Sequence, residues 1–202
     1  LTMSNMLNLL TKPSWCFSML QTKRRQFGNI VGHVKGVDDM SSLSDWTNSQ
    51  FDPSLKWEDV AELRKSWDKK LIIKGIMDKE DARAAVGVGA DAIVVSNHGG
   101  RQLDGTISSI KALPQILDEV GDKCEVWMDG GIRTGQDILR AVALGAQGTL
   151  IGRAFLYGLG ANGKDGVSQT LEILQRELDL TMGLCGKKNL AEVDKSILYQ
   201  YQ

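Results

Sequence analysis

Long apolar runs are absent from this chain, and cysteine, proline and histidine are rare in it. No window of the sequence holds 18 unbroken apolar residues, whereas a membrane-spanning helix needs about 20, so no segment is expected to cross a bilayer. The three cysteines, Cys16, Cys124 and Cys185, lie far apart and in no metal-ligand spacing. They therefore predict reduced thiols in the cytoplasm, with no disulfide and no metal site. The formal net charge of −1 gives no overall positive field that would favour nucleic acid.

Acidic residues are missing from the first 36 positions, which carry the basic residues Lys12, Lys23, Arg24, Arg25 and Lys35. A basic, acid-poor leader is typical of a transit segment or of a surface that contacts anionic lipid. A long loop or insertion on a larger protein is the third interpretation. We expect residues 1–50 to be a loop or insert region, mobile or in contact with a membrane. Because the first residue is Leu1, we also expect that the natural start lies elsewhere.

From about residue 57 the chain alternates short apolar runs with helical patterns. The apolar runs are 71–75, 92–96, 125–131 and 148–152, and the helical patterns are 79–90, 108–120, 135–146 and a closing amphipathic stretch at 167–186. Continuous apolar strands between helices predict a parallel sheet covered by helices. Residues 80–96 also align without gaps with residues 136–152. This internal repetition favours a barrel of strand–helix units over a doubly wound sheet.

The number of strands leaves two interpretations open. A (β/α)8 TIM barrel has eight strands, and the apolar runs supply four, all after residue 70. Either the sheet is open, or these are the last four strands of a barrel. The fold class that we expect is α/β, a (β/α)8 barrel of which residues 51–202 form about the last four βα units and a closing helix.

Polar residues suited to chemistry follow the first two apolar runs directly. In parallel sheets and barrels, active sites form beyond the carboxyl ends of the strands. Lys74 lies at the end of the first run. Its side chain either points into such a site or extends its ammonium group into solvent. His98 follows the second run and can exchange a proton near neutral pH, although a structural histidine is the alternative. Arg101 lies three residues further on and can hold a carboxylate by two hydrogen bonds.

The last two apolar runs end in glycine-rich turns, DGGIRTG at 129–135 and GRA at 152–154. Barrels commonly bind phosphate with backbone N–H groups after strands seven and eight. Glycine opens such a turn to a ligand, and Arg133 and Arg153 supply positive charge. One glycine-rich turn is weak evidence, but two consecutive turns with matching arginines predict an anion site at the last two strands of a barrel.

Four segments together resemble the family of FMN-dependent L-2-hydroxy-acid oxidases and dehydrogenases, which includes glycolate oxidase, lactate oxidase and flavocytochrome b2. They are KG at 74–75, SNHGGRQLDG at 96–105, DGGIRTGQD at 129–137 and LIGRAFLYG at 150–158. The stretch FDPSLKWEDVAELRKSW at 51–67 and the tail at 166–186 are most similar to the family's bacterial respiratory L-lactate dehydrogenase branch. The resemblance runs from about residue 50 to 198.

This resemblance implies FMN as the cofactor and a role for each matching residue. Lys74 would contact the pyrimidine edge of the flavin and stabilise negative charge on the reduced ring. His98 would be the general base on the 2-hydroxy acid, and Arg101 would bind its carboxylate. The other FMN contacts implied are Ser96, Asp129, Gly130, Gly131, Arg133, Gly152 and Arg153.

The function expected from the resemblance is oxidation of an L-2-hydroxy acid. L-lactate is the leading candidate substrate, with pyruvate as its product, and the electron acceptor is quinone or oxygen. An oxygen-using oxidase of the same family is one alternative. Another is an inactive or partner-dependent half-barrel that binds flavin or phosphate weakly.

The family's first half supplies two active-site tyrosines and an aspartate that orients the histidine, and Tyr157, Tyr199 and Tyr201 lie outside the matching motifs. We expect a homo-oligomer for the full-length protein, no nucleic-acid partner, and a cytoplasmic location, with peripheral contact at the inner membrane as the alternative.

Overall fold

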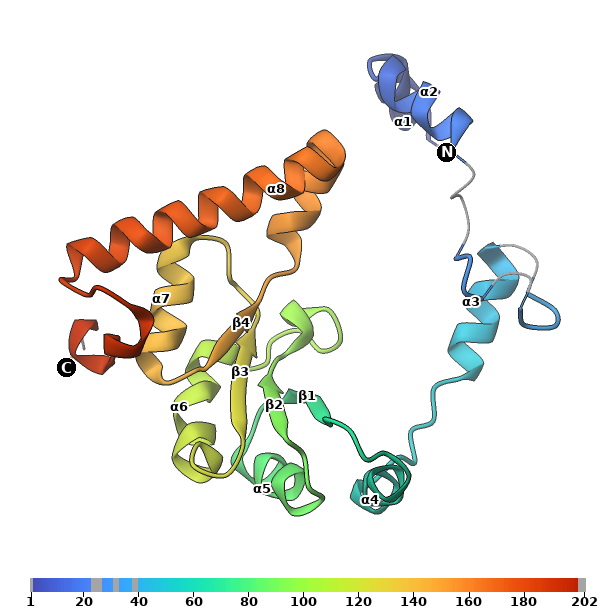
Figure 1. Ribbon diagram of the computed structural model, residues 1–202. Helices are drawn as coiled ribbons and strands as arrows, with labels where there is room; N and C mark the ends of the chain where they lie inside the picture. The colour runs from blue at the N-terminus through green and yellow to red at the C-terminus, as the bar shows by residue number, and fades with distance from the viewer. Residues whose placement is uncertain (1, 23–26, 31–32, 38–39, 200–202) are drawn as a thin grey trace. The chain divides into compact units, whose positions relative to one another are not determined.

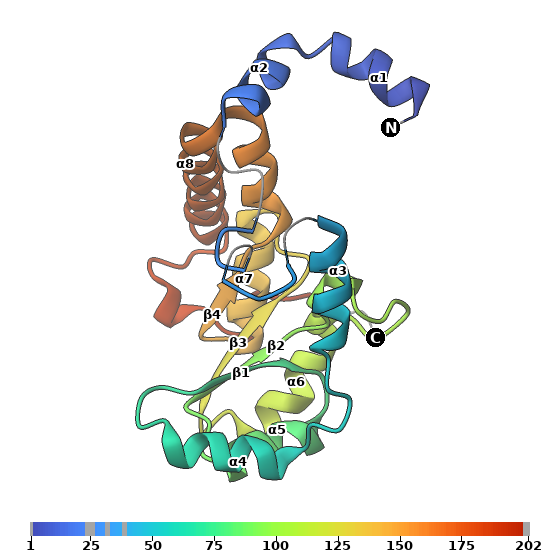
Figure 2. The ribbon, with the colours of Figure 1, turned by 90° about the vertical axis from the view of Figure 1, so that its right-hand side faces the viewer.

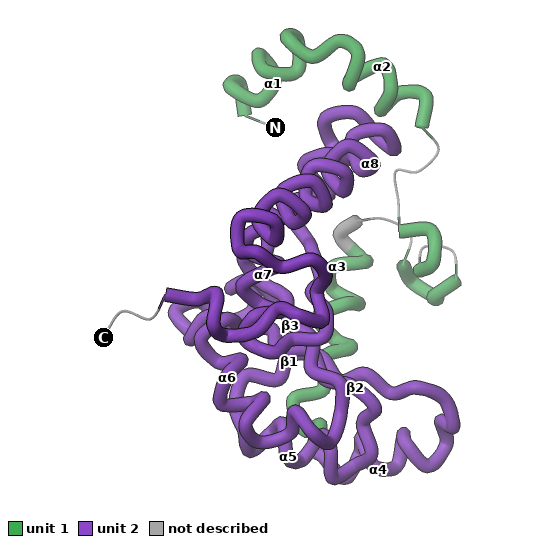
Figure 3. Tube along the Cα trace, turned by 60° about the vertical axis from the view of Figure 1, so that its left-hand side comes forward, with its two compact units in different colours: residues 1–55 green, residues 56–202 purple. Residues whose placement is uncertain are grey.

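The structure is a computed structural model that describes residues 2–22, 27–30, 33–37 and 40–199. The chain divides into two units, residues 1–55 and residues 56–202, which are coloured separately in Figure 3. The second unit holds the whole of the predicted sheet.

Four parallel strands form the sheet of the second unit. They are β1 (Ile72–Ile76), β2 (Ala92–Val95), β3 (Glu125–Asp129) and β4 (Gly148–Leu150), in the order β1-β2-β3-β4 (Figures 1 and 2). Each strand falls within one predicted apolar run or extends one residue past it, and the parallel sheet is confirmed. Among the described residues, β1 and β4 each pair with one strand, so the sheet has two open edges.

Three helices connect the strands and cover the sheet. They are α5 (Lys79–Gly87), α6 (Ser109–Val120) and α7 (Gly135–Leu144), which lie beside the strands in Figure 1. The core between them is apolar and fully buried, with Ile93, Val126 and Met128 from the strands packed among Leu113 and Ile116 of α6. Each such side chain stabilises the fold by roughly 1.5–3 kcal/mol relative to an exposed one. Burial explains the continuous apolar run of β2, all of whose residues are buried, whereas Ile72 of β1 remains 47% exposed.

The two segments that repeat in the sequence have equivalent helix ends. Helix α5 begins after Asp78 and α7 begins after Thr134, and each of these side chains accepts the backbone N–H of the residue three positions on. After each helix a glycine takes a left-handed conformation, Gly89 with φ +86° and Gly145 with φ +115°. A left-handed glycine satisfies the last helical carbonyls and turns the chain. The repeat therefore marks equivalent strand–helix units.

The closing helix begins earlier than the sequence pattern predicts. Helix α8 runs from Arg153 to Leu184 and is interrupted at Asn162 and Gly163, where the chain turns back (orange to red in Figure 1). Before and after this turn, Gly158 and Gly166 approach so closely that neither has room for a side chain. The prediction of residues 167–186 therefore missed the first part of the helix, because its glycines are poor helix formers.

The amphipathic pattern at 167–186 predicts one apolar face with Leu171, Leu174, Leu178 and Met182, and this prediction is only partly correct. Leu174 and Met182 are buried and Leu178 packs beside Met182, whereas the side chain of Leu171 is 50% exposed. Short 3-10 turns at Leu190–Glu192 and Lys195–Ile197 follow the helix. They bring the C-terminal segment against α7 and α8, where Val193 joins the buried cluster around Met182.

Helix α4 (Trp57–Ser66) precedes β1 and is tied to the sheet's helices by side-chain contacts. The indole N–H of Trp57 donates to Asp81 at 3.3 Å, which joins the start of α4 to α5. At the other end of α4, Arg64 lies 3.6 Å from Asp91, which also pairs with Lys70 at 2.8 Å. The hydrogen bond holds the start of α4 at the first turn of α5, and the ion pair holds its end beside Asp91, directly before β2.

Within its described residues, the first unit contains three helices: α1 (Met3–Leu10), α2 (Pro13–Gln21) and α3 (Met40–Ser49). Helices α1 and α2, both within the described part of the chain, contain no buried residue. Their large apolar side chains are exposed instead, with Leu10 at 78% and Leu20 at 69%. No helix in the described residues is long and apolar enough to cross a membrane.

Candidate active site

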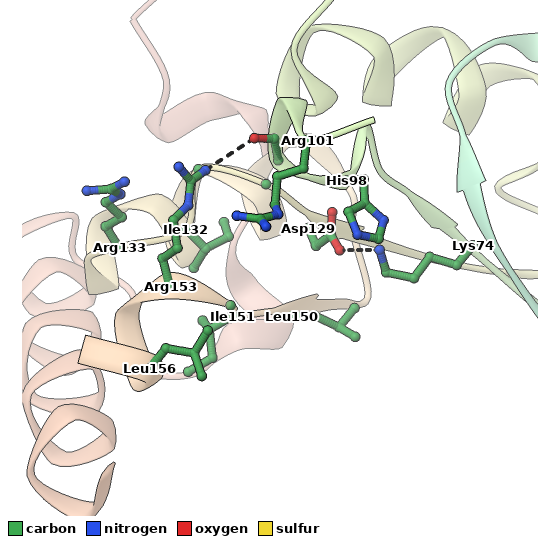
Figure 4. A pocket seen from close by; sticks show the side chains of 14 residues that line it. Lys74, His98, Arg101, Asp129, Ile132, Arg133, Leu150, Ile151, Arg153 and Leu156 are labelled. Atoms are coloured by element: carbon green, nitrogen blue, oxygen red, sulfur yellow. Dashed lines mark hydrogen bonds and ion pairs between the residues drawn. The ribbon is translucent and has the colours of Figure 1, made fainter. Parts of the chain in front are cut away.

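A pocket of about 440 Å³ lies beyond the carboxyl ends of the strands (Figure 4). It brings together nine of the residues that the sequence singled out: Lys74, His98, Arg101, Asp129, Gly130, Gly131, Arg133, Gly152 and Arg153. Figure 4 shows Arg133 on one side of the pocket and Lys74 on the other, with Arg101, Asp129 and His98 between them. The topology alone predicts this gathering, because parallel strands end at one edge of the sheet.

Five further residues line the pocket and were not singled out from the sequence: Gly99, Ile132, Leu150, Ile151 and Leu156. Leu150 ends β4 and Ile151 follows it directly, so a position near the end of the apolar run 148–152 is the available signal for both. Leu156 belongs to the first part of α8, which the sequence analysis did not recognise as helix. Ser96 is the one predicted site residue that lies behind the lining and does not form it.

Lys74 is held in the pocket by two partners. Its Nζ atom lies 2.7 Å from Oδ2 of Asp129 and donates to Oγ of Ser96 at 2.8 Å. Ser96 is 2% exposed, so its hydroxyl forms a buried support for the lysine. The ammonium group is therefore fixed at the ends of β1, β2 and β3 and does not extend freely into solvent.

His98 and Arg101 lie at the two ends of one short turn after β2. The 3-10 turn His98–Gly100 begins with a histidine at φ +56°, the one non-glycine residue with positive φ among the described residues. Oγ of Ser96 accepts the backbone N–H of His98 at 3.1 Å. Arg101 N–H in turn donates to the His98 carbonyl at 3.4 Å. A histidine in this strained conformation at a pocket is typical of a functional site.

The loop between β3 and α7 presents Arg133. Gly130 and Gly131 have φ values of +90° and +77°, and Oδ2 of Asp137 accepts the backbone N–H groups of Arg133 at 3.1 Å and Thr134 at 3.0 Å. Partial burial would raise the pKa of Asp137, but the hydrogen bonds from Arg133 and Thr134 outweigh it and hold that pKa below its usual value. The carboxylate thus fixes the backbone from which Arg133 projects.

The starts of α7 and α8 differ in how their N–H groups are satisfied. In α7, the backbone N–H of Gly135 donates to Glu177 at 2.9 Å, in addition to the bonds made by Asp137. In α8, no side chain caps the start at Gly152 and no acidic residue lies in the first turn. Arg153 opens α8, and its guanidinium donates to the carbonyl of Gly99 at 3.4 Å. An uncapped helix start beside an arginine suits an anion.

The pocket fits the FMN that the sequence implies. Oδ1 of Asp129 is buried and, within the described residues, has no hydrogen-bond partner, so it is available to a hydroxyl donor. A side chain at Gly131 or Gly152 would meet no atom within 4 Å, which leaves room for a ligand there. Arg133 and Arg153 supply charge for a phosphate. In the described part of the chain no three His, Cys, Asp or Glu residues gather as a metal site would require.

Comparison with known proteins gives the family. The model of the FMN-dependent dehydrogenase family matches residues 1–200. The chain belongs to this family. The L-lactate dehydrogenase of Caulobacter sp. (strain K31) is 44% identical over 200 residues, which cover 97% of this chain and 52% of that protein. The L-lactate dehydrogenase of Pseudomonas aeruginosa (strain LESB58) is 45% identical, with 95% and 51% covered.

Solved structures of FMN-dependent dehydrogenases have the same fold. The monotopic membrane protein (S)-mandelate dehydrogenase matches with a TM-score of 0.91 and 34% identity over 100% of this chain and 53% of its own. A mandelate oxidase variant with an FMN adduct matches with a TM-score of 0.66 and 48% identity over 69% and 44%. The predicted family, its FMN cofactor and the TIM-barrel class are thereby confirmed, and this chain spans about half the length of the relatives that it matches.

Proposed function

We propose that this chain is the part of an FMN-dependent L-2-hydroxy-acid dehydrogenase that holds the cofactor, the catalytic base and the carboxylate clamp. The observation that carries the proposal is the single pocket that gathers His98, Arg101 and Lys74 with the arginine-bearing turns 129–135 and 152–154. The proposed substrate is L-lactate, because relatives at 44% and 45% identity are named L-lactate dehydrogenase. The product is pyruvate.

Each of these pocket residues has a separate role in the proposed reaction. Oxidation of a 2-hydroxy acid removes two electrons and two protons, and FMN, when bound, would take up both electrons and one of the protons. His98 accepts one of the protons as general base. Arg101 holds the substrate carboxylate by two hydrogen bonds and so fixes the reacting carbon beside His98. Lys74 stabilises negative charge that develops on the cofactor, and Arg133 and Arg153 bind its phosphate.

Flavin absorbance tests this function directly. We expect the protein, expressed from its whole reading frame, to be yellow, and we expect L-lactate to bleach the oxidised-flavin band without oxygen present. D-lactate should leave the band unchanged, because it offers its hydroxyl to the wrong side when its carboxylate is held by Arg101. A protein that retains flavin but shows no bleaching by L-lactate would contradict the proposal. Faster reoxidation by a soluble quinone than by oxygen would identify a dehydrogenase over an oxidase.

A half-barrel that needs a partner is the competing proposal. It is favoured by the open edges of the sheet, where β1 and β4 each pair with one strand among the described residues. Unpaired strand edges favour pairing with another segment or chain. On this proposal the 202 residues alone bind flavin weakly and are not reduced by lactate, whereas supplying the segment that corresponds to the rest of the relatives restores both.

We also propose that the first unit contacts a membrane surface peripherally. Its α1 and α2 expose Leu7, Leu10, Trp15, Phe17 and Leu20, and the first 36 residues carry five basic residues and no acidic one. Apolar and aromatic side chains combined with basic charge favour the surface of an anionic bilayer. The relative named a monotopic membrane protein aligns with 100% of this chain.

Vesicle sedimentation measures this contact. We expect the protein to sediment with vesicles that contain anionic lipid and to be released by high salt, which screens the basic residues. Leu10→Ser with Phe17→Ser should weaken binding by at least about tenfold, since each removes a side chain worth roughly 1.5 kcal/mol or more in apolar surroundings. Leu63→Ser, which changes an exposed leucine of α4, is the matched control. Equal binding by all three proteins would refute the contact.

A further inference from the structure

Asn97 directly precedes the pocket residue His98 but does not line the pocket itself. It follows the buried Ser96 and precedes His98, and its φ and ψ are −93° and +22°. Its side chain is neither a candidate cofactor contact nor a candidate substrate contact. Both ends of its carboxamide and its backbone N–H are nevertheless hydrogen-bonded, to the loop after β2 and to the start of α6.

The carboxamide of Asn97 joins the two ends of the loop that carries His98. Its Oδ1 accepts the backbone N–H of Gly99 at 3.0 Å, and its Nδ2 donates to the carbonyl of Ile107 at 3.3 Å. The backbone N–H of Asn97 also donates to Oγ of the buried Ser109, at the start of α6, at 3.4 Å. One side chain thus closes the turn at residues 97–99 and ties it to the point where the loop ends.

These hydrogen bonds act where the backbone conformation is least favourable. His98, Gly99 and Gly100 have φ values of +56°, +67° and +73°, three consecutive residues in the left-handed region. Glycine adopts this region freely, but histidine does so only when its surroundings hold it there. The Asn97–Gly99 hydrogen bond spans His98, so it holds the strained residue from both sides.

The same side chain lies against the neighbouring strand end. A Cβ atom built on Gly130 would come within 3.4 Å of Oδ1 of Asn97 and 3.0 Å of Oγ of Ser109. Asn97 is therefore fitted between the loop after β2 and the turn after β3. Its position determines how these two sides of the pocket meet.

We propose that Asn97 is a positioning residue that holds His98 in its left-handed conformation and so sets the direction of the imidazole relative to Arg101. The catalytic consequence rests on the proposed function, in which His98 is the general base. The conformational consequence does not, because it concerns the loop alone. Two measurements separate these consequences.

The first measurement is histidine NMR, which needs no catalysis. His33 and His98 are the two histidines of this sequence, and in the protein expressed from its whole reading frame the variants His98→Gln and His33→Gln assign their ring signals. We expect Asn97→Ala to move the His98 ring signals and leave those of His33 in place. Asn97→Ser should move them less, because a serine hydroxyl can still accept the N–H of Gly99. Asn189→Ala is the matched control, since Asn189 caps a 3-10 turn through the same kind of bond to Glu192.

The second measurement is stopped-flow reduction of bound FMN by L-lactate. We expect Asn97→Ala to lower the reduction rate by roughly 10- to 100-fold, the effect of a base displaced by about 1 Å. The dissociation constant of FMN should change by less than about twofold, because Asn97 does not line the pocket, and the pH at half-maximal rate should move with the environment of His98. Asn97→Ser should recover part of the rate.

The outcomes distinguish the two proposals. Unmoved His98 signals in Asn97→Ala overturn the positioning role, and so does an equal shift in Asn189→Ala. Loss of FMN in proportion to the loss of rate also overturns it, because it would indicate general damage to the pocket. If the wild-type protein holds FMN but is not reduced by L-lactate, the proposed function fails, while a His98 shift in Asn97→Ala would still support the role of Asn97 in the loop.

Discussion

Replacing His98 with asparagine is expected to slow reduction of bound FMN by L-lactate by about 10²–10⁴-fold, the usual contribution of a general base. Asparagine is the informative replacement because it tolerates a positive φ better than other residues with a side chain. Since His98 has φ +56°, this variant removes the base and keeps the turn. FMN should remain bound, because Lys74 and the turns at 129–135 and 152–154 carry the proposed cofactor contacts.

The loss should appear in the chemical step and not in substrate affinity, since Arg101 is unchanged. Stopped-flow traces at saturating L-lactate measure that step, and the flavin spectrum before mixing measures occupancy. His33→Asn serves as the control, because it changes the other histidine of the chain. A His98→Asn protein that is reduced at the wild-type rate would show that the base is a different residue.

Replacing Arg101 with lysine is expected to lower kcat/KM for L-lactate by about 30- to 150-fold. An ammonium group can donate to a carboxylate but cannot reproduce the planar two-point contact of a guanidinium. The loss of part of a charge-assisted pair costs roughly 2–3 kcal/mol, and each 1.36 kcal/mol is a factor of about ten. Flavin binding should hardly change, because Arg101 is assigned to the substrate.

Steady-state kinetics and flavin titration together check the Arg101→Lys result. Arg83→Lys is a matched control outside the pocket, where Arg83 makes a two-point contact with Glu119 at 2.9 and 3.0 Å. It should leave both measurements near the wild-type values. If Arg101→Lys instead releases flavin and leaves the lactate kinetics intact, Arg101 is a cofactor residue and the carboxylate clamp lies elsewhere.

The sheet and most of the pocket can be predicted from the sequence because burial imposes a pattern that is visible there. All four residues of β2, Ala92–Val95, are buried, so the strand reads as an unbroken apolar run. The polar residues directly after it then fall at the carboxyl edge. The glycines of the turn 129–135 are equally visible, since the turn needs positive φ at Gly130 and Gly131 and other residues adopt that conformation at a cost.

The helices α1 and α2 could not be predicted in the same way. They bury no residue of the described chain, so the alternation of buried and exposed positions that reveals the other helices is absent from them. The start of α8 was missed for another reason: Gly158 and Gly166 are required by close approach of the chain to itself, and close approach is not visible in a linear pattern. The bonds of Asn97 depend likewise on where Ile107 and Ser109 come to lie.

The unequal starts of α7 and α8 determine how firmly the pocket can retain an anion as ionic strength changes. The positive end of α7 is already neutralised by Asp137 and Glu177, which leaves the α8 start and the exposed guanidinium groups of Arg133 and Arg153. Charge on exposed groups is screened over about 8 Å at physiological salt, whereas backbone N–H groups of a helix start act at contact distance. Added salt would thus weaken the binding of a phosphate-bearing cofactor to the extent that the arginines contribute to it. The affinity that persists at high salt would measure the contribution of the helix start alone.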